Sequence, residues 1–409
     1  MQSASDSLVE RLRAYCLAKP GITPSITFGE RQPSYHVLGD FLRHFAQFFL
    51  NDRPVRVLIR TSEADLAAFA GNPVLQISKS MHWDRTGWKW ADLLLDGTLS
   101  EAEILKLLDS SYTICISEIQ PHDLQLAEIA ERDLTMFQAI DALIDLNQLS
   151  QRRDAIKSLL DYEIFMRSRA ADEAEFALGQ SKIGGLPDLP DSWIYPTFDG
   201  KALAFLAQVN LTEIPSEIHR NPLPSTGILY FFSVFGWQKE DGDLHPDLDW
   251  ERAGEPGFSQ VLYYDGATTM LRRREKPDDK KVFKTVAVDF VETLSIPRGS
   301  DYAHDPVLEN LDWDEDEFEH LTDLYFDFSF VLERRLGSTP DHKLLGYADP
   351  IQAALTSADT RLLCQIDSDY HNAGGDMMWG DGGTIYFIIG RDALLRGDYS
   401  HIDSDMQSG

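Results

Sequence analysis

The feature that most limits how this chain can fold is an internal repeat in its C-terminal half. The stretch LAFLAQVN, followed after a gap by STGILYFFSV, is similar to RLLCQIDS followed by GGTIYFIIGR. The two copies keep nearly the same spacing, with 22 positions from Gln208 to Tyr230 and 21 from Gln365 to Tyr386. A weaker match precedes them, where SKIGGLPD stands before the first copy and HKLLGYAD before the second. The repeat predicts a duplicated unit of two strands joined by a loop and a glycine turn.

The glycine turn of the second copy, in MWGDGGTIYFIIGRD, has two readings: a phosphate cradle or a structural turn. A dinucleotide-binding fingerprint needs a third glycine three positions after Gly382, where Ile385 stands, and a helix after it. A P-loop needs Lys and then Ser or Thr after its last glycine, but Thr384 and Ile385 follow Gly383. Gly227 and Gly383 each lie three residues before the tyrosine of their copy. We therefore predict structural turns in which glycine allows a positive φ or a close approach of another segment.

The first part of the chain mixes helical and strand patterns and predicts a small α/β or α+β domain over residues 1–125. Apolar spacing predicts a helix at 38–50, and a further helix is predicted to begin after Ser100 as its N-cap. Three apolar runs predict strands at 55–60, 74–80 and 112–117. Residues 126–178 show a helical pattern of unusual length, which predicts a helical connector between two domains.

Residues 179–409 show short apolar runs separated by Pro, Gly and Asp turns, which is typical of a mostly β domain. Strands are predicted at 203–211, 227–235, 260–265 and 281–297. The acidic stretch 311–336 favours a helix. The predicted fold class is α+β, with a mostly β C-terminal domain that contains the duplication, preceded by the smaller domain and the helical connector. A chain of 409 residues exceeds what one hydrophobic core usually serves, which favours more than one domain.

The formal net charge of −30 opposes nucleic-acid binding, because such binding needs Lys and Arg against phosphates. Residues 181–409 hold 41 of the 67 acidic residues but 19 of the 37 basic ones, which leaves them a net charge of −22. This acidity either serves solubility or attracts a basic partner. No signal-peptide pattern and no apolar run of about 20 residues is recognisable, so we expect a cytoplasmic protein without a membrane partner.

Metal and disulfide chemistry find little support in the sequence. Three scattered cysteines, Cys16, Cys115 and Cys364, are too few for a disulfide framework or a cysteine-based zinc site. The stretch from Asp312 resembles a calcium loop in its first ligand positions, but it has Glu317 at the turn glycine and Asp323 at the bidentate glutamate. We predict an acidic helix start there instead, and we expect no metal and no cofactor.

The loop IDSDYHNAGGDMMWGD is the strongest catalytic candidate, because it gathers carboxylates and a histidine between two predicted strands. The candidate catalytic residues are Asp367, Asp369, His371 and Asp381, with Asp376 nearby, and Trp379 offers a stacking face. No recognised metal-ligand or nucleophile spacing accompanies them. The loop therefore predicts a hydrolase-type enzyme or a small-ligand binder as the alternative to a protein-binding function.

Six motifs together give a resemblance over about residues 175–409. SKIGGLPDLPDSWIYP, FLAQVNLTEIP, LPSTGILYFF, HKLLGYADPIQ, LLCQIDSD and MWGDGGTIYFII occur in the order and approximate spacing of the YwqG-like family, a bacterial domain family of unknown function. The resemblance implies a mostly β, duplicated α+β fold, and it carries over no established catalytic residue.

Some members of the family that these motifs resemble look like neighbours of toxin genes, which implies a toxin-neutralising immunity protein. Together with the acidity, this resemblance leads us to expect a cytosolic protein that binds a basic protein such as a toxin. The residues expected to meet that partner are Asp312, Asp314, Glu315, Asp316 and Trp379. The first 175 residues carry no motif of the family.

Overall fold

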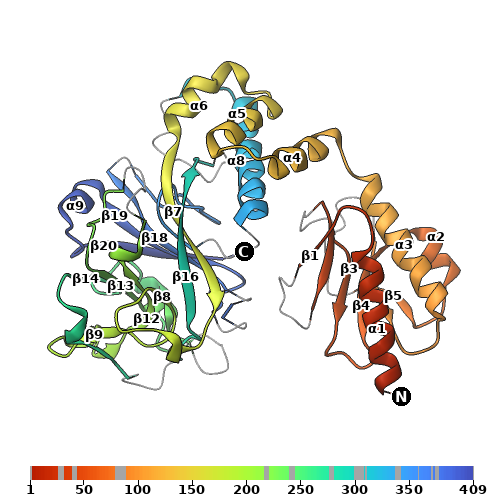
Figure 1. Ribbon diagram of the computed structural model, residues 1–409, viewed down its shortest axis with the longest axis horizontal. Coiled ribbons are helices and arrows are strands. Elements are labelled where there is room, and N and C mark those ends of the chain that lie inside the picture. Colours follow the sequence, from red (N-terminus) through yellow and green to blue (C-terminus); the bar gives the residue numbers. More distant parts are fainter. Residues whose placement is uncertain are drawn as a thin grey trace. The chain divides into compact units, whose positions relative to one another are not determined.

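The computed structural model (Figure 1) describes two compact units. Unit 1 comprises residues 1–133 and 330–338, and unit 2 comprises residues 134–329 and 339–409. The described residues are 2–25, 32–38, 44–78, 89–215, 221–238, 245–275, 281–298, 308, 311–336, 342–357, 359–369, 372–373 and 377–408. Both units combine helices with antiparallel sheets, so the α+β fold class is confirmed.

Unit 1 contains a six-stranded sheet in the order β1-β2-β3-β4-β6-β5. Its strands are β1 Ile22–Ser25, β2 Ser34–Val37, β3 His44–Phe49, β4 Arg56–Thr61, β5 Leu75–Ile77 and β6 Lys89–Leu94. Its helices are α1 Gln2–Leu17, α2 Glu63–Ala68, α3 Glu101–Ser117 and α4 Pro121–Glu131. α1 and α3 share one apolar core with the sheet. The predicted cap is confirmed, because the Ser100 hydroxyl accepts from the Glu103 amide.

Two predictions for unit 1 are wrong. Residues 112–117 form the last turns of α3 and not a strand, because Ile114 and Cys115 continue a buried face at helical spacing. The hydroxyl of Ser111 also bridges α3 to the sheet by donating to the carbonyl of Phe45 at 2.6 Å. Within the predicted helix 38–50, residues 44–49 form β3, which pairs with strands on both sides. Packing of the helix at 112–117 and strand pairing at 44–49 therefore override local propensity.

The predicted helical connector is helical only in part. After α4 come α5 Met136–Leu146, the 3-10 turn η2 Ser150–Arg152 and α6 Arg153–Leu159. Residues 161–170 then form the strand β7 Asp161–Ala170, contrary to the prediction. β7 pairs with one strand over its full length and with a second strand through residues 163–165. These two neighbours stabilise the extended form of a segment with mixed sequence.

Unit 2 is built on a ten-stranded antiparallel sheet in the order β14-β13-β12-β8-β16-β7-β17-β18-β19-β20. Besides β7, its strands are β8 Lys182–Ile183, β12 Ala204–Asn210, β13 Ile228–Ser233, β14 Ser259–Tyr264, β16 Val286–Ser295, β17 Lys343–Leu345, β18 Thr360–Asp367, β19 Thr384–Gly390 and β20 Ile402–Gln407. Short pairs add β9 Asp188–Pro190 with β15 Leu271–Arg273, and β10 Thr197–Phe198 with β11 Lys201–Ala202. The remaining described α-helices are α8 Glu315–Leu336 and α9 Arg391–Arg396. Every described helix is too short or too polar to cross a membrane.

The predicted duplication is confirmed by strand register. Gln208 lies directly opposite Tyr230 in the β12–β13 pair, and Gln365 lies directly opposite Tyr386 in the β18–β19 pair. The first strand of each copy also has a shift of register at the equivalent place. The shift lies between Phe205 and Ala207 in β12. It lies between Leu362 and Cys364 in β18. We call β8, β12, β13 and β14 the first copy and β17, β18, β19 and β20 the second copy.

The two copies exchange their leading strands. β7 comes before the first copy in sequence but pairs with β17 of the second, and β16 comes before the second copy but pairs with β8 of the first. β7 and β16 also pair with each other over ten residues at the centre of the sheet. The order of the strands is therefore symmetric about the β7–β16 pair.

The sheet curves until its two edge strands, β14 and β20, approach each other. The hydroxyl of Ser404 in β20 donates to that of Ser259 in β14 at 2.6 Å. Aromatic side chains of the two copies also meet in one core, where the rings of Phe231 and Phe387 lie 5.1 Å apart. The sheet is thus rolled up but not sealed by a backbone ladder between β14 and β20 within the described residues.

Candidate functional site

The first copy encloses a buried polar cluster around Asp188. The backbone amide of Asp188 donates to the side chain of Gln208 at 2.9 Å, and the Gln208 amide group donates back to the Asp188 carboxylate at 2.9 Å. The hydroxyl of Tyr230 donates to the Asp188 carbonyl at 2.6 Å. The same carboxylate accepts from Arg273 at 2.9 Å and lies 3.6 Å from the ammonium of Lys182. Asp188, Gln208 and Lys182 are fully buried.

The second copy repeats the lysine, aspartate, glutamine and tyrosine of this cluster. Asp349 exchanges hydrogen bonds with Gln365 at 3.1 and 3.0 Å, and its carbonyl accepts from the Tyr386 hydroxyl at 2.7 Å. The ammonium of Lys343 lies 2.5 Å from the Asp349 carboxylate. The equal spacing of Lys and Asp in SKIGGLPD and HKLLGYAD therefore has a structural cause, because in each copy these two residues and the Gln–Tyr pair form one cluster.

A second carboxylate completes each cluster, and the two copies supply it from different positions. Lys343 binds Glu163 of β7 at 2.9 Å, and the Glu163 carboxylate is hydrogen-bonded by Ser295. Lys182 binds Glu173 at 2.7 Å, and Glu173 accepts a hydrogen bond from Thr285. By strand pairing, Thr285 occupies the position beside the first copy that Glu163 occupies beside the second. The position that holds Glu163 in the second copy thus holds the hydroxyl of Thr285 in the first, and the position that holds the hydroxyl of Ser295 in the second holds Glu173 in the first.

The two lysine clusters are closed to a ligand and act as architecture. Burial would raise the pKa of Asp188, but the hydrogen bond from Arg273 and the charge of Lys182 outweigh it and lower that pKa. Lys182 is completely buried and Lys343 is 4% exposed, so neither ammonium group is accessible to a substrate. The clusters fix the loops that follow β8 and β17 against the strands of their copies.

The described residues of the candidate catalytic loop do not form one group. Asp367 accepts from the hydroxyl of Thr384 at 2.8 Å. Asp369 is fully buried and accepts from Ser168 at 2.9 Å and from the Asn372 amide at 2.8 Å. Asp381 is exposed. His371 and Asp376 lie outside the described residues.

The expected stacking face at Trp379 is wrong. Its side chain is 1% exposed and packs edge-on against Phe283, with ring centroids 5.0 Å apart. The glycine turn beside it is structural as predicted, because a Cβ on Gly383 would lie 2.1 Å from the carbonyl oxygen of Gln407. Gly227, its counterpart, has φ of +95°. Among the described residues, no group of three or more His, Cys, Asp or Glu side chains is arranged to hold a metal ion.

The buried Asp369 predicts a loss of stability in acid. Burial would raise its pKa, but the His342 ring, 3.6 Å from the carboxylate, and the hydrogen bonds from Asn372 and Ser168 outweigh burial and lower the pKa to about 2. A lowered folded-state pKa stabilises the fold above the unfolded value, and this contribution disappears as the pH falls towards 2. We expect Asp369→Asn to cost about 2 kcal/mol at pH 7 and to weaken the pH dependence between about 4 and 2. Urea unfolding at several pH values measures both effects, and an unchanged slope would contradict the assignment.

The acidic stretch 312–316 forms the exposed start of α8, as predicted. Asp314 and Glu317 cap the helix reciprocally, since the Asp314 carboxylate accepts from the Glu317 amide at 2.9 Å and the Glu317 carboxylate accepts from the Asp314 amide at 3.1 Å. Glu317 also forms a bidentate pair with Arg152 at 2.6 and 2.7 Å. The four predicted partner-binding acids, Asp312, Asp314, Glu315 and Asp316, are all exposed. They remain available to a partner.

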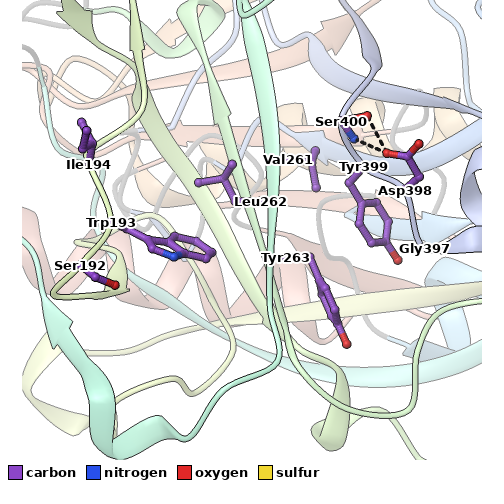
Figure 2. A pocket seen from close by; sticks show the side chains of 10 residues that line it. All are labelled: Ser192, Trp193, Ile194, Val261, Leu262, Tyr263, Gly397, Asp398, Tyr399 and Ser400. Atoms are coloured by element: carbon purple, nitrogen blue, oxygen red, sulfur yellow. Dashed lines mark hydrogen bonds between the residues drawn. The ribbon is translucent and has the colours of Figure 1, made fainter.

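A groove of about 520 Å³ lies where β14 faces the chain before β20 (Figure 2). Ile194 is 90% exposed at its rim, whereas Tyr399 is 6% exposed and contacts Tyr263 with ring centroids 5.8 Å apart. The carboxylate of Asp398 is exposed and accepts from the hydroxyl of Ser400 at 2.6 Å. The groove is lined by Ser192, Trp193, Ile194, Val261, Leu262, Tyr263, Gly397, Asp398, Tyr399 and Ser400.

In the second copy, hydrogen bonds join β20 to the segment that corresponds to residues 190–192 of the first copy. Gln407 of β20 accepts from the amides of Ile351 and Gln352, both at 2.8 Å, and donates to the carbonyl of Ala353 at 2.9 Å. Strand register makes Tyr264 of β14 the counterpart of Gln407. Tyr264 instead donates to the Ala267 carbonyl and packs against Trp193. The two copies therefore differ at the point where the first copy has the groove.

Sequence reasoning did not find the groove. Its walls come from three segments, 192–194, 261–263 and 397–400, which only the rolled sheet brings together. The sequence signal that was available is the departure from the repeat, because the first copy has Trp193 and Ile194 where the second has Ala354 and Leu355. The match between SKIGGLPD and HKLLGYAD indicates that the two segments correspond, but it does not predict that their lysines form buried ion pairs.

Comparison with known proteins gives a family and no activity. A model of a domain of unknown function, DUF1963, matches residues 181–407, a range that includes both copies. No curated protein matches the sequence. Among solved structures, the crystal structure of a Deinococcus radiodurans protein with a DUF419 domain is 19% identical, covering 29% of this chain and 87% of that chain. Its TM-score of 0.25 supports no conclusion about fold or function.

Proposed function

The chain belongs to the DUF1963 family, whose domain has no known function, and from this premise we propose that it is a protein-binding protein. The proposed partner has a basic surface and places an apolar side chain in the groove beside β14. The observation that carries the proposal is the difference between the copies, because a groove lined with aromatic side chains lies beside β14 in the first copy, whereas Gln407 binds the corresponding segment in the second. Large exposed side chains such as Ile194 serve as anchors in protein interfaces.

Charge supports a basic partner. The chain has a formal net charge of −30, and the exposed acids 312–316 add a local concentration of negative charge at the start of α8. Exposed charges of this kind increase the rate of encounter with a basic surface more than they slow dissociation. We assign steering to these acids and anchoring to the groove.

The finer identity implied by the sequence motifs, a YwqG-like protein with a toxin-neutralising role, belongs to this proposal. A basic toxin fits both the charge and the groove, and an immunity protein needs no catalytic group. The alternative of a hydrolase-type site in the loop 367–381 has less support, because Asp369 is enclosed and the described candidate carboxylates have separate partners.

The test begins with proteins captured at low salt from the native cell, followed by kinetics with the purified captured protein. We expect its association rate to fall steeply as salt is raised, because screening shortens the reach of the acids to about 8 Å at physiological ionic strength. Changing Asp314, Glu315 and Asp316 to Lys is expected to slow association with little effect on dissociation. Surface plasmon resonance measures both rates.

The groove is tested separately in the same assay. Ile194→Ser is expected to speed dissociation at least about tenfold, the effect of losing an interface anchor. Leu124→Ser is the matched control, since Leu124 is 55% exposed but belongs to unit 1. If no basic protein binds, or if the rates ignore salt, the charge reversals and Ile194→Ser, the proposed function is wrong and the loop 367–381 becomes the leading site.

A further inference from the structure

β14 is an edge strand with one free side. Over Ser259–Tyr264 it forms a backbone ladder with β13, and β13 is its sole ladder partner among the described residues. In an antiparallel strand, alternate residues direct their N–H and C=O groups away from the paired side. These groups of β14 therefore face the groove, where an edge strand is a template for pairing with another extended chain.

The opposite edge, β20, approaches this side without completing the sheet. The contacts between the two edges are made by side chains, namely the Ser404–Ser259 hydrogen bond of 2.6 Å and the ring contact between Tyr263 and Tyr399. A closed barrel would join its edge strands by backbone hydrogen bonds. Here the groove takes the place of that ladder along residues 261–263.

The groove walls lie on both sides of the strand. In Figure 2, Leu262 and Trp193 lie on one side of β14, and Val261, Tyr263 and Tyr399 lie on the other. This follows from strand alternation, which sends successive side chains to opposite faces. An added strand also alternates its side chains, so it would contact both sets of walls at once, as in peptide recognition by strand addition.

Charge indicates the composition of the added segment. Asp398 lies in the groove, Asp191 precedes the wall segment 192–194, and Asp265 follows β14. Three arginines also lie near the groove: Arg396 is next to the 397–400 wall, Arg272 is paired with Asp191 at 3.7 Å, and Arg274 donates to the carbonyl of Trp193 at 3.2 Å. Among the described residues that line the groove, Asp398 alone carries a charge, in agreement with the net negative charge of the chain.

We infer that an extended segment of the basic partner adds to β14 as a further strand, with apolar side chains against Trp193 and Leu262 and a basic side chain at Asp398. This inference rests on the proposed function and specifies how the groove is used. Backbone hydrogen bonds to β14 supply affinity, and the walls on the two sides supply selectivity.

The test uses a synthetic peptide of about eight alternating Val and Arg residues, the length of an ordinary strand. Two further peptides have the same sequence with backbone N-methyl groups at odd or at even positions, so charge and side chains are unchanged. We expect one methylated form to bind about a hundredfold more weakly, because it loses about three ladder hydrogen bonds at the partner-facing side. Isothermal titration at physiological salt measures all three, with Leu124→Ser protein as the control and Ile194→Ser expected to weaken binding.

Hydrogen exchange provides the second measurement. The unmethylated peptide is expected to slow exchange of amides within residues 259–264, whose outward N–H groups it would pair. Equal binding by all three peptides, protection elsewhere in the chain, or no binding by any peptide would each overturn strand addition. None of these outcomes removes the proposed function, which fails instead if the natural partner is insensitive to salt and to Ile194→Ser.

Discussion

Asp188→Ala is expected to destabilise unit 2 by about 3–5 kcal/mol, the usual cost of removing one member of a buried ion pair. The substitution removes one acceptor from each of four groups, namely Lys182, Arg273, the Gln208 side-chain amide and the Gly179 backbone amide. Lys182 and Arg273 keep their contacts with Glu173, and Gln208 keeps the carbonyl of Gln180. All four would remain enclosed unless the loop after β8 opened to water. Urea unfolding followed by tryptophan fluorescence measures the loss, and hydrogen exchange in β12 and β13 assigns it to unit 2.

Two matched variants show whether burial is the cause. Asp349→Ala changes the equivalent residue of the second copy, whose side chain is 22% exposed, so we expect a smaller loss of about 1–3 kcal/mol. Asp289→Ala removes a carboxylate that is 56% exposed and 3.7 Å from Arg167, and it should change stability by no more than about 0.5 kcal/mol. Equal losses for all three variants would refute the assigned role of the buried cluster.

The duplicated architecture could be predicted because its signal is local. In each copy the glutamine and the tyrosine lie opposite each other on adjacent strands, Gln208 with Tyr230 and Gln365 with Tyr386. Their separation in sequence therefore depends mainly on the length of the loop between the two strands. The glycines before the two tyrosines leave few alternative residues, because Gly383 lies close to the Gln407 backbone and Gly227 has a positive φ and lies against the ring of Tyr263. These features survive in the sequence because substitution at them is costly.

The elements that were predicted wrongly depend on distant partners. β7 has a mixed sequence and owes its extended form to β16 and β17, which lie far along the chain. Trp379 is predicted to offer a stacking face, but in the fold it is buried and Phe283, from a distant part of the chain, packs against it. The groove is of the same kind, since no local pattern places Trp193 near Tyr399.

The change of places between glutamate and hydroxyl in the two copies leads to the second large prediction. Glu163→Thr leaves buried Lys343 with Asp349 alone and is expected to cost about 3 kcal/mol. Ser295→Glu by itself adds a second carboxylate beside Glu163 and should also destabilise, because like charges in a buried site repel. Each single variant changes the number of carboxylates around Lys343.

The double variant Glu163→Thr/Ser295→Glu is expected to recover most of both losses. It gives the second copy the arrangement that Thr285 and Glu173 already form around Lys182, at 2.7 Å from that ammonium group. The interaction free energy between the two positions should therefore be favourable and larger than the loss of stability that remains in the double variant. A double-mutant cycle of urea unfolding measures it. Additive losses would mean that the two sites are independent, and the correspondence between the copies would then stop at the backbone. A recovered double variant would show that each buried lysine needs one carboxylate hydrogen-bonded by a hydroxyl, whichever of the two positions supplies it.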